Sequence, residues 1–282
     1  MSIDPVSRRV HEDARRRPER PFPTVEPTFF SRFECKYIVD PAIVPGMREF
    51  LEPFTVLDSY ASSADGLRYP ICSLYLDSPD LALYQQTVEG ERDRFKLRVR
   101  TYSDDPAQPA FCEVKRKLNS VVHKRRAGIG RALVPQLLGG DGFDPARLRD
   151  DVRRDAEYFR YHVLLTDARP VIRIKYLREA YQATGNEPAR ITIDTDLMHA
   201  VTFDEELCHA FGRWTATRLD GVILEIKFTE RFPWWIQELV REFGLAQRAV
   251  PKYVLSVDHM LLEGRESAMA LGGVLLPPRR SA

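Results

Sequence analysis

The segment CEVKRK, residues 112–117, alternates apolar and charged side chains and places an acid two positions before a base. The same acid-x-base spacing recurs as ECK at residues 34–36 and as EIK at residues 225–227, each within an alternating run. Successive side chains of a β-strand point to opposite faces of the sheet. Each segment therefore predicts a strand with one apolar face and one face that carries both an acid and a base.

Period-2 alternation of this kind dominates the chain and predicts eight strands, separated in places by amphipathic helices. Short spacings between consecutive runs favour antiparallel pairing. The strands are expected at residues 30–39, 71–77, 94–102, 110–118, 121–127, 170–178, 189–195 and 221–228. Helices are expected from the capping pairs Asp40–Pro41 and Ser78–Pro79, and over residues 145–166, 204–211, 231–243 and 255–264.

The composition is typical of a globular protein, with 44% hydrophobic and 29% charged residues and a formal net charge of +1 over 282 residues. A net charge this close to zero does not favour nucleic acid as a partner. No apolar run reaches membrane-spanning length, and the N-terminus has no signal-peptide core. The four cysteines lack metal-site spacing and are expected to be reduced thiols, so the expected localisation is cytoplasmic.

One central domain is expected, between two tails. Residues 1–28 are rich in Arg and Pro without an apolar period, which is typical of a disordered or loosely attached tail. No low-complexity linker or helical repeat divides residues 29–265, which are expected to form the domain. Residues 266–282 are expected to be a C-terminal tail.

The charged faces of the predicted strands are strongly biased towards bases. With Lys124 and Arg126 included, they hold twelve bases and four acids. One interpretation is an antiparallel sheet with one buried and one solvated face. A solvated face usually mixes its charges, however, because clustered like charges repel. The alternative is an α+β fold in which eight antiparallel strands close into a barrel, with the basic faces inward and the amphipathic helices packed outside.

Bases enclosed in such a barrel require an anionic guest. Arg offers paired donors to phosphate oxygens, and Lys offers a mobile point charge. The few carboxylates suit a hard divalent cation that bridges phosphate oxygens. The barrel interpretation therefore predicts a site for triphosphate or polyphosphate together with a metal ion.

The chain resembles the VTC domain of the triphosphate tunnel metalloenzyme, or CYTH-like, superfamily over most of residues 29–260. The resemblance rests on an ordered series of segments: FECKYIV, SLYLDSPDLALYQQTVEGERDRFKLRVRTY, FCEVKRKLNSVVHKRRAG, RITIDTDL, ILEIKF and PKYVLS. It implies a closed antiparallel barrel that forms a tunnel. It also implies the activity of the vacuolar members, which transfer the terminal phosphate of ATP to a polyphosphate chain with Mn²⁺ or Mg²⁺. The chain looks like the stand-alone bacterial form, which is compatible with a separately encoded membrane partner.

The resemblance further implies roles for individual residues. The implied catalytic set is Lys36, Arg98, Arg100, Arg173 and Glu225. The implied phosphate-binding set adds Lys115, Lys124, Arg190, Lys227 and Lys252. Glu225 is the implied metal ligand, and the further carboxylates for the metal are Glu34, Glu113 and Asp194, although Asp194 would alternatively pair with Arg190. Pro251 stands where the family usually has a serine, which removes one expected phosphate contact.

The predicted function is phosphoryl transfer on triphosphate or polyphosphate, with synthesis of polyphosphate from ATP as the first interpretation. A tripolyphosphate or nucleoside triphosphatase would differ in using water as the acceptor. A non-catalytic module that binds polyphosphate or nucleotides is the third interpretation, and the carboxylates argue against it because they are costly among cations without a metal. Tyr75 and Asp77 face inward by parity and are expected either to contact the nucleotide or to pack. The Trp234–Trp235 pair is expected to pack on the barrel, with a partner or membrane contact as the lesser alternative.

Overall fold

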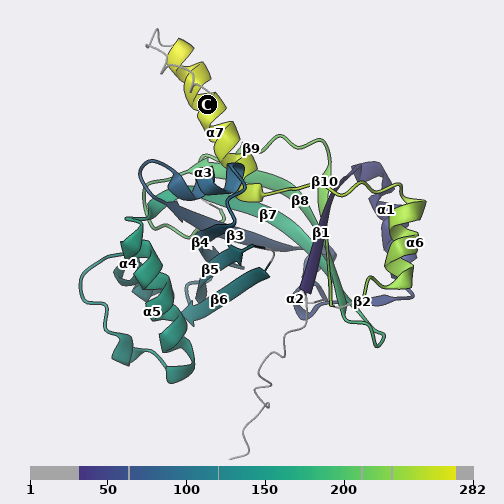
Figure 1. The fold of residues 1–282 in the computed structure, drawn as a ribbon, viewed down its shortest axis with the longest axis horizontal. Coiled ribbons are helices and arrows are strands. Elements are labelled where there is room, and N and C mark those ends of the chain that lie inside the picture. The colour runs from purple at the N-terminus through teal and green to yellow at the C-terminus, as the bar shows by residue number, and fades with distance from the viewer. Residues whose placement is uncertain (1–31, 63, 120, 211, 230, 271–282) are drawn as a thin grey trace, which may run out of the picture. The chain divides into compact units, whose positions relative to one another are not determined.

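A computed structural model describes residues 32–270 of the chain, apart from residues 63, 120, 211 and 230. The expected N-terminal tail, residues 1–28, and the last twelve residues lie outside this described part. The described part contains one antiparallel sheet with helices packed on its outer face, shown in Figure 1.

Eight long strands follow one another in the order β1, β10, β8, β7, β3, β4, β5 and β6. All eight predicted strands are present, and two short strands were not predicted. The long strands are β1 (Arg32–Val39), β3 (Tyr69–Asp77), β4 (Asp93–Thr101), β5 (Ala110–Leu118), β6 (Val121–Ile129), β7 (Arg169–Ala183), β8 (Ala189–Val201) and β10 (Val222–Thr229). The short strands are β2 (Thr55–Leu57), which pairs with β7, and β9 (Thr215–Ala216), which pairs with β8.

The predicted closure into a barrel is not seen, because no backbone pairing joins the edge strands β1 and β6 within the described residues. The sheet nevertheless curls strongly. Glu34 on the edge strand β1 and Lys115 on β5, the strand next to the opposite edge, form an ion pair at 3.3 Å. Side chains, rather than a hydrogen-bonded ladder, therefore bridge the two ends of the sheet across its inner face.

The helices are short apart from two. They are α1 (Val44–Leu51), α2 (Ser59–Ser62), α3 (Ala82–Val88), α4 (Val134–Leu137), α5 (Asp150–Leu165), α6 (Trp234–Glu242) and α7 (Lys252–Ala270), with 3₁₀ turns at Pro41–Ile43, Asp65–Leu67, Arg131–Leu133 and Pro145–Arg147. Two groups cover the outer face of the sheet (Figure 1). Met47 of α1 and Ile236 of α6 are buried against β1, β10 and β8, whereas Phe159 of α5 and Leu137 of α4 are buried against β4, β5 and β6. Each such side chain contributes about 1.5–3 kcal/mol by leaving water.

One of the two predicted capping pairs has the expected N-cap. Asp40 accepts a hydrogen bond from the backbone N–H of Ala42 at 2.8 Å and caps the first 3₁₀ turn. The second helix begins later than expected, at Ala82, so its N-cap is Leu81 and not Ser78, although the Ser78 hydroxyl still accepts a hydrogen bond from the N–H of Ala82 at 2.9 Å. The predicted helix over residues 204–211 was wrong, because the described residues of this segment, 204–210, are irregular. They lie on the outer face of β7, where Lys175 donates to the His209 carbonyl at 3.0 Å.

Helix α7 packs on the inner face at one end of the sheet, unlike α1, α4, α5 and α6. Tyr253 and Val257 of α7 share a buried cluster with Ile172 and Ile174 of β7. The helix extends beyond the predicted 255–264 at both ends, and its last turns project away from the sheet in Figure 1. Lys252 is the first residue of α7, and its ammonium lies 2.6 Å from Asp194 of β8, over the inner face.

A basic face as the candidate functional site

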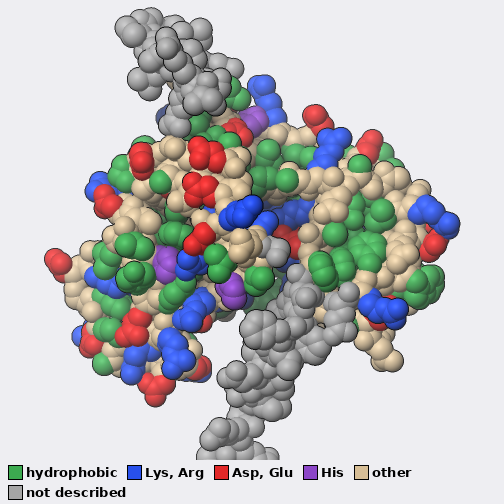
Figure 2. All heavy atoms as spheres, in the orientation of Figure 1, with side chains coloured by type: hydrophobic (Ala, Val, Ile, Leu, Met, Phe, Trp, Pro, Cys, Tyr) green, Lys and Arg blue, Asp and Glu red, His purple; other side chains and the backbone are tan. Residues whose placement is uncertain are grey.

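The inner face of the curled sheet gathers Lys and Arg side chains, and we call it the basic face. Residues directly opposite each other in an antiparallel ladder share a face, so the strand register identifies its members. Figure 2 shows Lys and Arg side chains gathered in a hollow, with Asp and Glu beside them. The bases are Lys36, Lys96, Arg98, Arg100, Lys115, Lys117, Lys124, Arg126, Arg178, Arg190, Lys227 and, from α7, Lys252; the carboxylates are Glu34, Glu113, Asp194 and Glu225.

The expected inward orientation of Arg173 was wrong. Arg173 lies opposite Leu74 of β3, on the outer face, whereas Ile172 and Ile174 point inward. This part of the inner face of β7 is apolar because Tyr253 and Val257 of α7 pack on it. Further along β7, beyond an irregularity in its pairing with β8, the inner face becomes polar.

Arg178 is the arginine that β7 contributes to the basic face, and no role was predicted for it. It lies opposite Asp194 of β8 and donates two hydrogen bonds to that carboxylate, at 2.6 and 2.8 Å. Lys252 lies 2.6 Å from the same carboxylate. Burial would raise the pKa of Asp194, but these two cations hold it below its usual value. Asp194 therefore does not pair with Arg190, which instead lies 2.6 Å from Asp58.

Glu113 is the most completely neutralised carboxylate of the basic face. Its side chain is 1% exposed and lies 2.6 Å from Arg98 and from Lys124 and 3.3 Å from Arg126. Burial opposes ionisation, yet Arg98, its neighbour Arg100 and Lys124 hold the pKa of Glu113 far below its usual range. Glu113 is therefore ionised near neutral pH and holds three bases together.

Glu34 and Glu225 share a third group of bases on adjacent strands. Lys36 lies 2.8 Å from Glu34 and 3.8 Å from Glu225, and Lys227 lies 2.5 Å from Glu225. Burial raises the pKa of Glu225, but Lys227 and Lys36 outweigh it and keep this carboxyl well below its usual range. The pKa of Glu34 is also lowered by lysines, although burial and the nearby charge of Glu225 oppose this.

Lys96 and Arg100 of β4 have no carboxylate within ion-pair distance among the described residues. Arg100 donates only to hydroxyls, those of Ser73 at 3.1 Å and Tyr176 at 3.2 Å. Burial lowers the pKa of Lys96 to about 8, and the nearby charge of Lys36 acts in the same direction. An anion beside Lys96 would favour the charged form of this lysine, and Arg100 lies on the same face, which makes β4 the strongest part of the face for binding phosphate. Parity placed Lys96 inward, but no function was predicted for it.

Tyr75 connects this part of the face to α7. Its hydroxyl accepts a hydrogen bond from Arg98 at 3.1 Å, and its ring stacks on Tyr253 with centroids 4.8 Å apart. Tyr253 in turn donates to Asp77 at 2.6 Å. Asp77 also accepts the backbone N–H groups that begin α3, so its role is in packing and capping. Burial raises the pKa of Tyr75, but cations led by Arg98 lower it to about 8.

The carboxylates fit a metal that substrate phosphates would help to bind. Among the described residues, no three His, Cys, Asp or Glu side chains are grouped closely enough to hold a metal by themselves. Mg²⁺ commonly uses one or two carboxylates together with phosphate oxygens. Glu34 and Glu225, which share Lys36, fit this donor set. Glu113 and Asp194 do not, because each lies on a separate strand and shares no ion-paired base with a second carboxylate among the described residues.

The sequence of the chain matches a known family. Residues 31–261 match the family model of the VTC domain. The chain belongs to the VTC domain family. This VTC domain is 28% identical over 284 residues to subunit 4 of the vacuolar transporter chaperone complex of Trypanosoma brucei, which covers 83% of this chain and 34% of the relative. It is 28% identical over 202 residues to subunit 2 of that complex in Schizosaccharomyces pombe, which covers 64% of this chain and 27% of the relative.

The VTC domain thus spans about a third of the length of the curated relatives that it matches. Among solved structures, a proposed adenylyl cyclase from Hippeastrum with a dominant triphosphatase activity overlaps 87% of this chain and 98% of that chain, with a TM-score of 0.43 and 12% identity. A proposed adenylate cyclase from Bacillus halodurans overlaps 77% of this chain and 92% of that chain, with a TM-score of 0.42 and 12% identity. In the described part of this VTC domain, no helix has the length and apolar character needed to cross a membrane.

Proposed function

We propose that this VTC domain transfers phosphoryl groups on triphosphate and polyphosphate, with ATP as the donor and the end of a polyphosphate chain as the acceptor. The family resemblance supports the activity, and the basic face supports the class of substrate. The bond between the β- and γ-phosphates of ATP breaks, and a new phosphoanhydride bond forms to a terminal oxygen of the acceptor. ADP leaves, and the chain becomes one phosphate longer.

The observation that carries this proposal is the excess of bases over acids on the basic face. Its twelve named bases face four carboxylates, and Asp58 beside Arg190 adds a fifth. One triphosphate brings about four negative charges, since its terminal phosphate carries up to two. The remaining excess of bases has no partner unless a second polyanion binds. A donor and a polyphosphate acceptor bound together meet this requirement better than a single triphosphate does.

We assign the donor triphosphate to the centre of the face. Arg98 and Arg100 lie on β4 beside Lys96, and the two arginines offer planar, multiple N–H donors that orient phosphate oxygens. Lys115 and Lys124, on the neighbouring strands, would then hold the adjoining phosphates. Arg178, Arg190 and Lys252, with Lys36 and Lys227, hold the second polyanion on the β7–β1 side. Phosphoryl transfer requires in-line positioning and charge neutralisation rather than a protein nucleophile, and these bases supply both.

Mn²⁺ or Mg²⁺ is part of the proposal, held by Glu225 and Glu34 together with phosphate oxygens. A metal so bound would neutralise charge on the transferred phosphate. Lys36 lies between the two carboxylates and keeps both ionised, so it prepares the donor set. Glu113 and Asp194 act as fixed counterions that position Arg98 and Arg178.

The test is to incubate the purified protein with ATP and Mn²⁺, with and without a short polyphosphate primer, and to measure polyphosphate on a gel and free phosphate in solution. We expect polymer from the natural chain and none from Arg98→Ala or Glu225→Ala. Arg241→Ala, an exposed arginine on α6, is the matched control and should behave like the natural chain. Free phosphate without polymer, lost in the same two variants, would replace the polymerase with a triphosphatase. Absence of both products would refute catalysis.

The relatives are named as subunits of a complex, and we extend to this chain the proposal of a separately encoded membrane partner. Co-purification of the tagged natural chain from detergent-solubilised membranes tests that part. A chain recovered alone would contradict it, without affecting the proposed reaction.

A further inference from the structure

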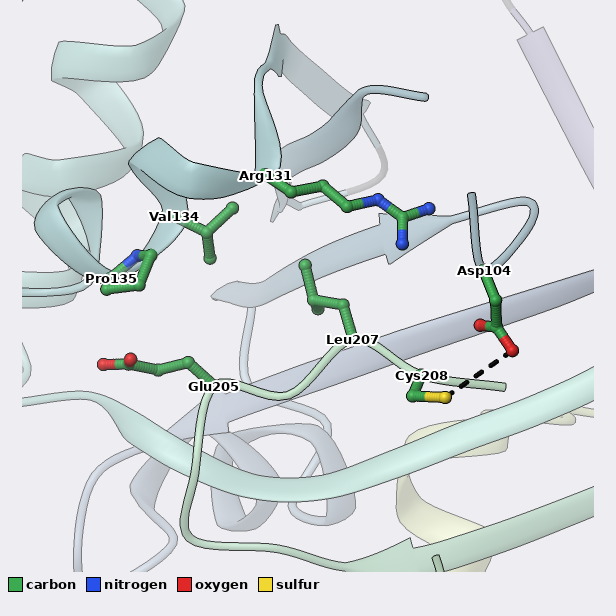
Figure 3. Close-up of a pocket in the computed structure, with 7 residues that line it drawn as sticks. All are labelled: Asp104, Arg131, Val134, Pro135, Glu205, Leu207 and Cys208. Carbon is green, nitrogen blue, oxygen red and sulfur yellow. Dashed lines mark hydrogen bonds between the residues drawn. The ribbon is translucent and has the colours of Figure 1, made fainter. Parts of the chain in front are cut away.

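Two hollows of about 250 Å³ are lined by residues outside the basic face, and they differ in the side chains that line them. Figure 3 shows the first, which contains both the base Arg131 and the acid Asp104. Asp104 accepts two backbone N–H groups there, and Arg131 donates to two backbone carbonyls, so the protein already engages both charges. The second hollow is different, because aromatic rings and an acid line it.

The second hollow lies where the start of α6 meets the segment that follows α1. Phe54 stacks on Trp235, with ring centroids 5.3 Å apart and ring planes 7° from parallel. Trp234 meets the same Phe54 at 89°, with centroids 5.5 Å apart. The perpendicular rings form a corner, in which Trp235 is buried, as predicted, whereas Trp234 is 63% exposed. We call the hollow lined by Phe54, Trp234, Trp235 and the neighbouring Glu187 the aromatic hollow.

The turn between β7 and β8 forms the other wall of the aromatic hollow. Thr184 donates to the carbonyl of Phe54 twice, through its backbone N–H at 3.1 Å and through its hydroxyl at 3.2 Å. Glu187 follows three residues later in the same turn and lines the hollow. The two hydrogen bonds tie the turn that carries this carboxylate to the aromatic corner, so the hollow is formed before any ligand binds.

The electrostatic character of the aromatic hollow favours a cation. Glu187 has no Lys or Arg within ion-pair distance in the described part of the chain, and no base is among the described residues that line the hollow. The face of an aromatic ring is the negative part of its quadrupole and attracts cations. The amino end of α6 carries a partial positive charge, but solvent screens it at this exposed site and the carboxylate of Glu187 counters it.

The open rim of the aromatic hollow indicates a side chain carried by a larger partner rather than a free small molecule. Trp234, Asn186 and Glu187 are exposed, so a small ligand would keep much of its surface in water, whereas ligand pockets usually enclose most of their ligand. A side chain on a polypeptide is shielded by the surrounding interface, where tryptophan is often central to binding. Arginine fits best among the cationic side chains, because its planar guanidinium stacks on aromatic rings and is more weakly hydrated than an ammonium.

We propose that the aromatic hollow binds an arginine side chain of a protein partner, at a site separate from the basic face. The guanidinium stacks on the exposed ring of Trp234 and pairs with the carboxylate of Glu187. Phe54, which contacts both tryptophans, holds the Trp234 ring in place. The contact does not depend on the proposed phosphoryl transfer, since none of these residues belongs to the basic face.

The indole N–H groups provide a direct test, because the chain has three tryptophans and Trp214 does not line the hollow. The full chain is labelled with ¹⁵N at tryptophan and titrated with the peptide acetyl-Gly-Arg-Gly-amide at constant ionic strength. We expect the Trp234 signal to move and to saturate, while the Trp214 signal stays in place. A peptide with citrulline instead of arginine keeps the planar shape without the charge, and it should bind at least about fivefold more weakly.

Substitutions of two exposed side chains test the assigned contacts without disturbing the core. Glu187→Gln should weaken binding of the arginine peptide and remove most of its preference over the citrulline peptide. Trp234→Ala, followed by the Trp235 signal, should weaken binding at least about fivefold. An unmoved Trp214 signal and an unchanged melting temperature report that each variant is folded. Arg98→Ala, on the basic face, is the control and should bind the peptide as the natural chain does.

Several results would overturn the proposal. Equal binding of the arginine and citrulline peptides would show that charge has no role in the aromatic hollow. Loss of the response in Arg98→Ala would place the peptide on the basic face. A Trp234 signal that ignores the arginine peptide would also refute the site, and movement of that signal with vesicles of phosphatidylcholine and phosphatidylserine would then identify a membrane contact instead.

Discussion

Replacing Glu113 by Gln should destabilise the protein strongly, and polyphosphate should restore much of the lost stability. The substitution keeps the shape of a side chain that is 1% exposed, so it creates no cavity. It leaves Arg98, Lys124 and Arg126 close together without the anion that they share. Removing one partner from a buried ion group costs about 3–5 kcal/mol. For a domain of this size that corresponds to a melting temperature about 6–20 °C lower.

The assay is thermal unfolding followed by circular dichroism in a buffer free of phosphate. A saturating polyanion stabilises any folded form that binds it, by about 2.7 kcal/mol at a hundred times the dissociation constant. We expect a larger gain for Glu113→Gln than for the natural chain, because the ligand replaces the missing negative charge. The matched control is Glu179→Gln, which removes an equally buried carboxylate that Arg48 holds on the outer face. This control should lose stability without the additional rescue.

The pH dependence gives an independent measure of the same carboxylate. The folded pKa of Glu113 lies far below the value of about 4.3 expected in the unfolded chain. Its contribution is therefore present above about pH 4 and is lost as the pH falls towards the folded pKa. Glu113→Gln should flatten this acid limb. A change in melting temperature of only a degree or two, or a rescue equal to that of Glu179→Gln, would refute the assignment of Glu113 as the central counterion.

Three further predictions concern individual side chains. In an absorbance titration at 295 nm, Tyr75→Phe should remove a tyrosine that ionises near pH 8. Because an unfolded tyrosine ionises near pH 10, the contribution of Tyr75 to stability grows between these two pH values. A natural chain with no tyrosine titration near pH 8 would contradict the assignment. Arg178→Ala should weaken polyphosphate binding at least about tenfold in calorimetry, because it removes a base and leaves the Asp194 carboxylate without its main partner on the basic face. Arg173→Ala should change the affinity less than about threefold, because Arg173 lies on the outer face. A larger loss of affinity in Arg173→Ala than in Arg178→Ala would return Arg173 to the site. Glu225→Gln should raise the Mn²⁺ concentration needed for half-maximal turnover at least about tenfold, and an unchanged metal dependence would show that the metal is held elsewhere.

The alternation of charges predicted most of the basic face because most of its strands are regular. Glu34, Lys36, Glu225 and Lys227 follow period 2 on strands that pair without interruption, so parity gave their orientation directly. The same logic placed the bases of β4, β5 and β6, including Lys96. Where neighbouring strands stay in register, one strand's pattern determines the face of the next.

Parity failed on β7 because a distant helix decides which face is apolar. Arg173 and Lys175 look like inward bases in isolation, but α7 places Tyr253 against Ile172 and Ile174. Arg178 was missed because the predicted strand ended there, although the real strand continues to Ala183. The available signal was the period-2 spacing of Tyr176 and Arg178, which places both side chains on the same face of β7. Closure of the sheet is not confirmed for another reason, since the curvature of a sheet depends on backbone geometry that side-chain patterns do not contain.

The side-chain bridge between the two ends of the sheet has a consequence for polymers. The Glu34–Lys115 pair is about one-third exposed at each partner, so water and salt screen it and it holds the ends together only weakly. A tunnel closed by a backbone ladder admits a long chain only by threading one of its ends. A seam held by this partly exposed ion pair can open sideways, and an internal stretch of polyphosphate can then enter without either end being free. Rising ionic strength would favour this lateral route, since it weakens the seam.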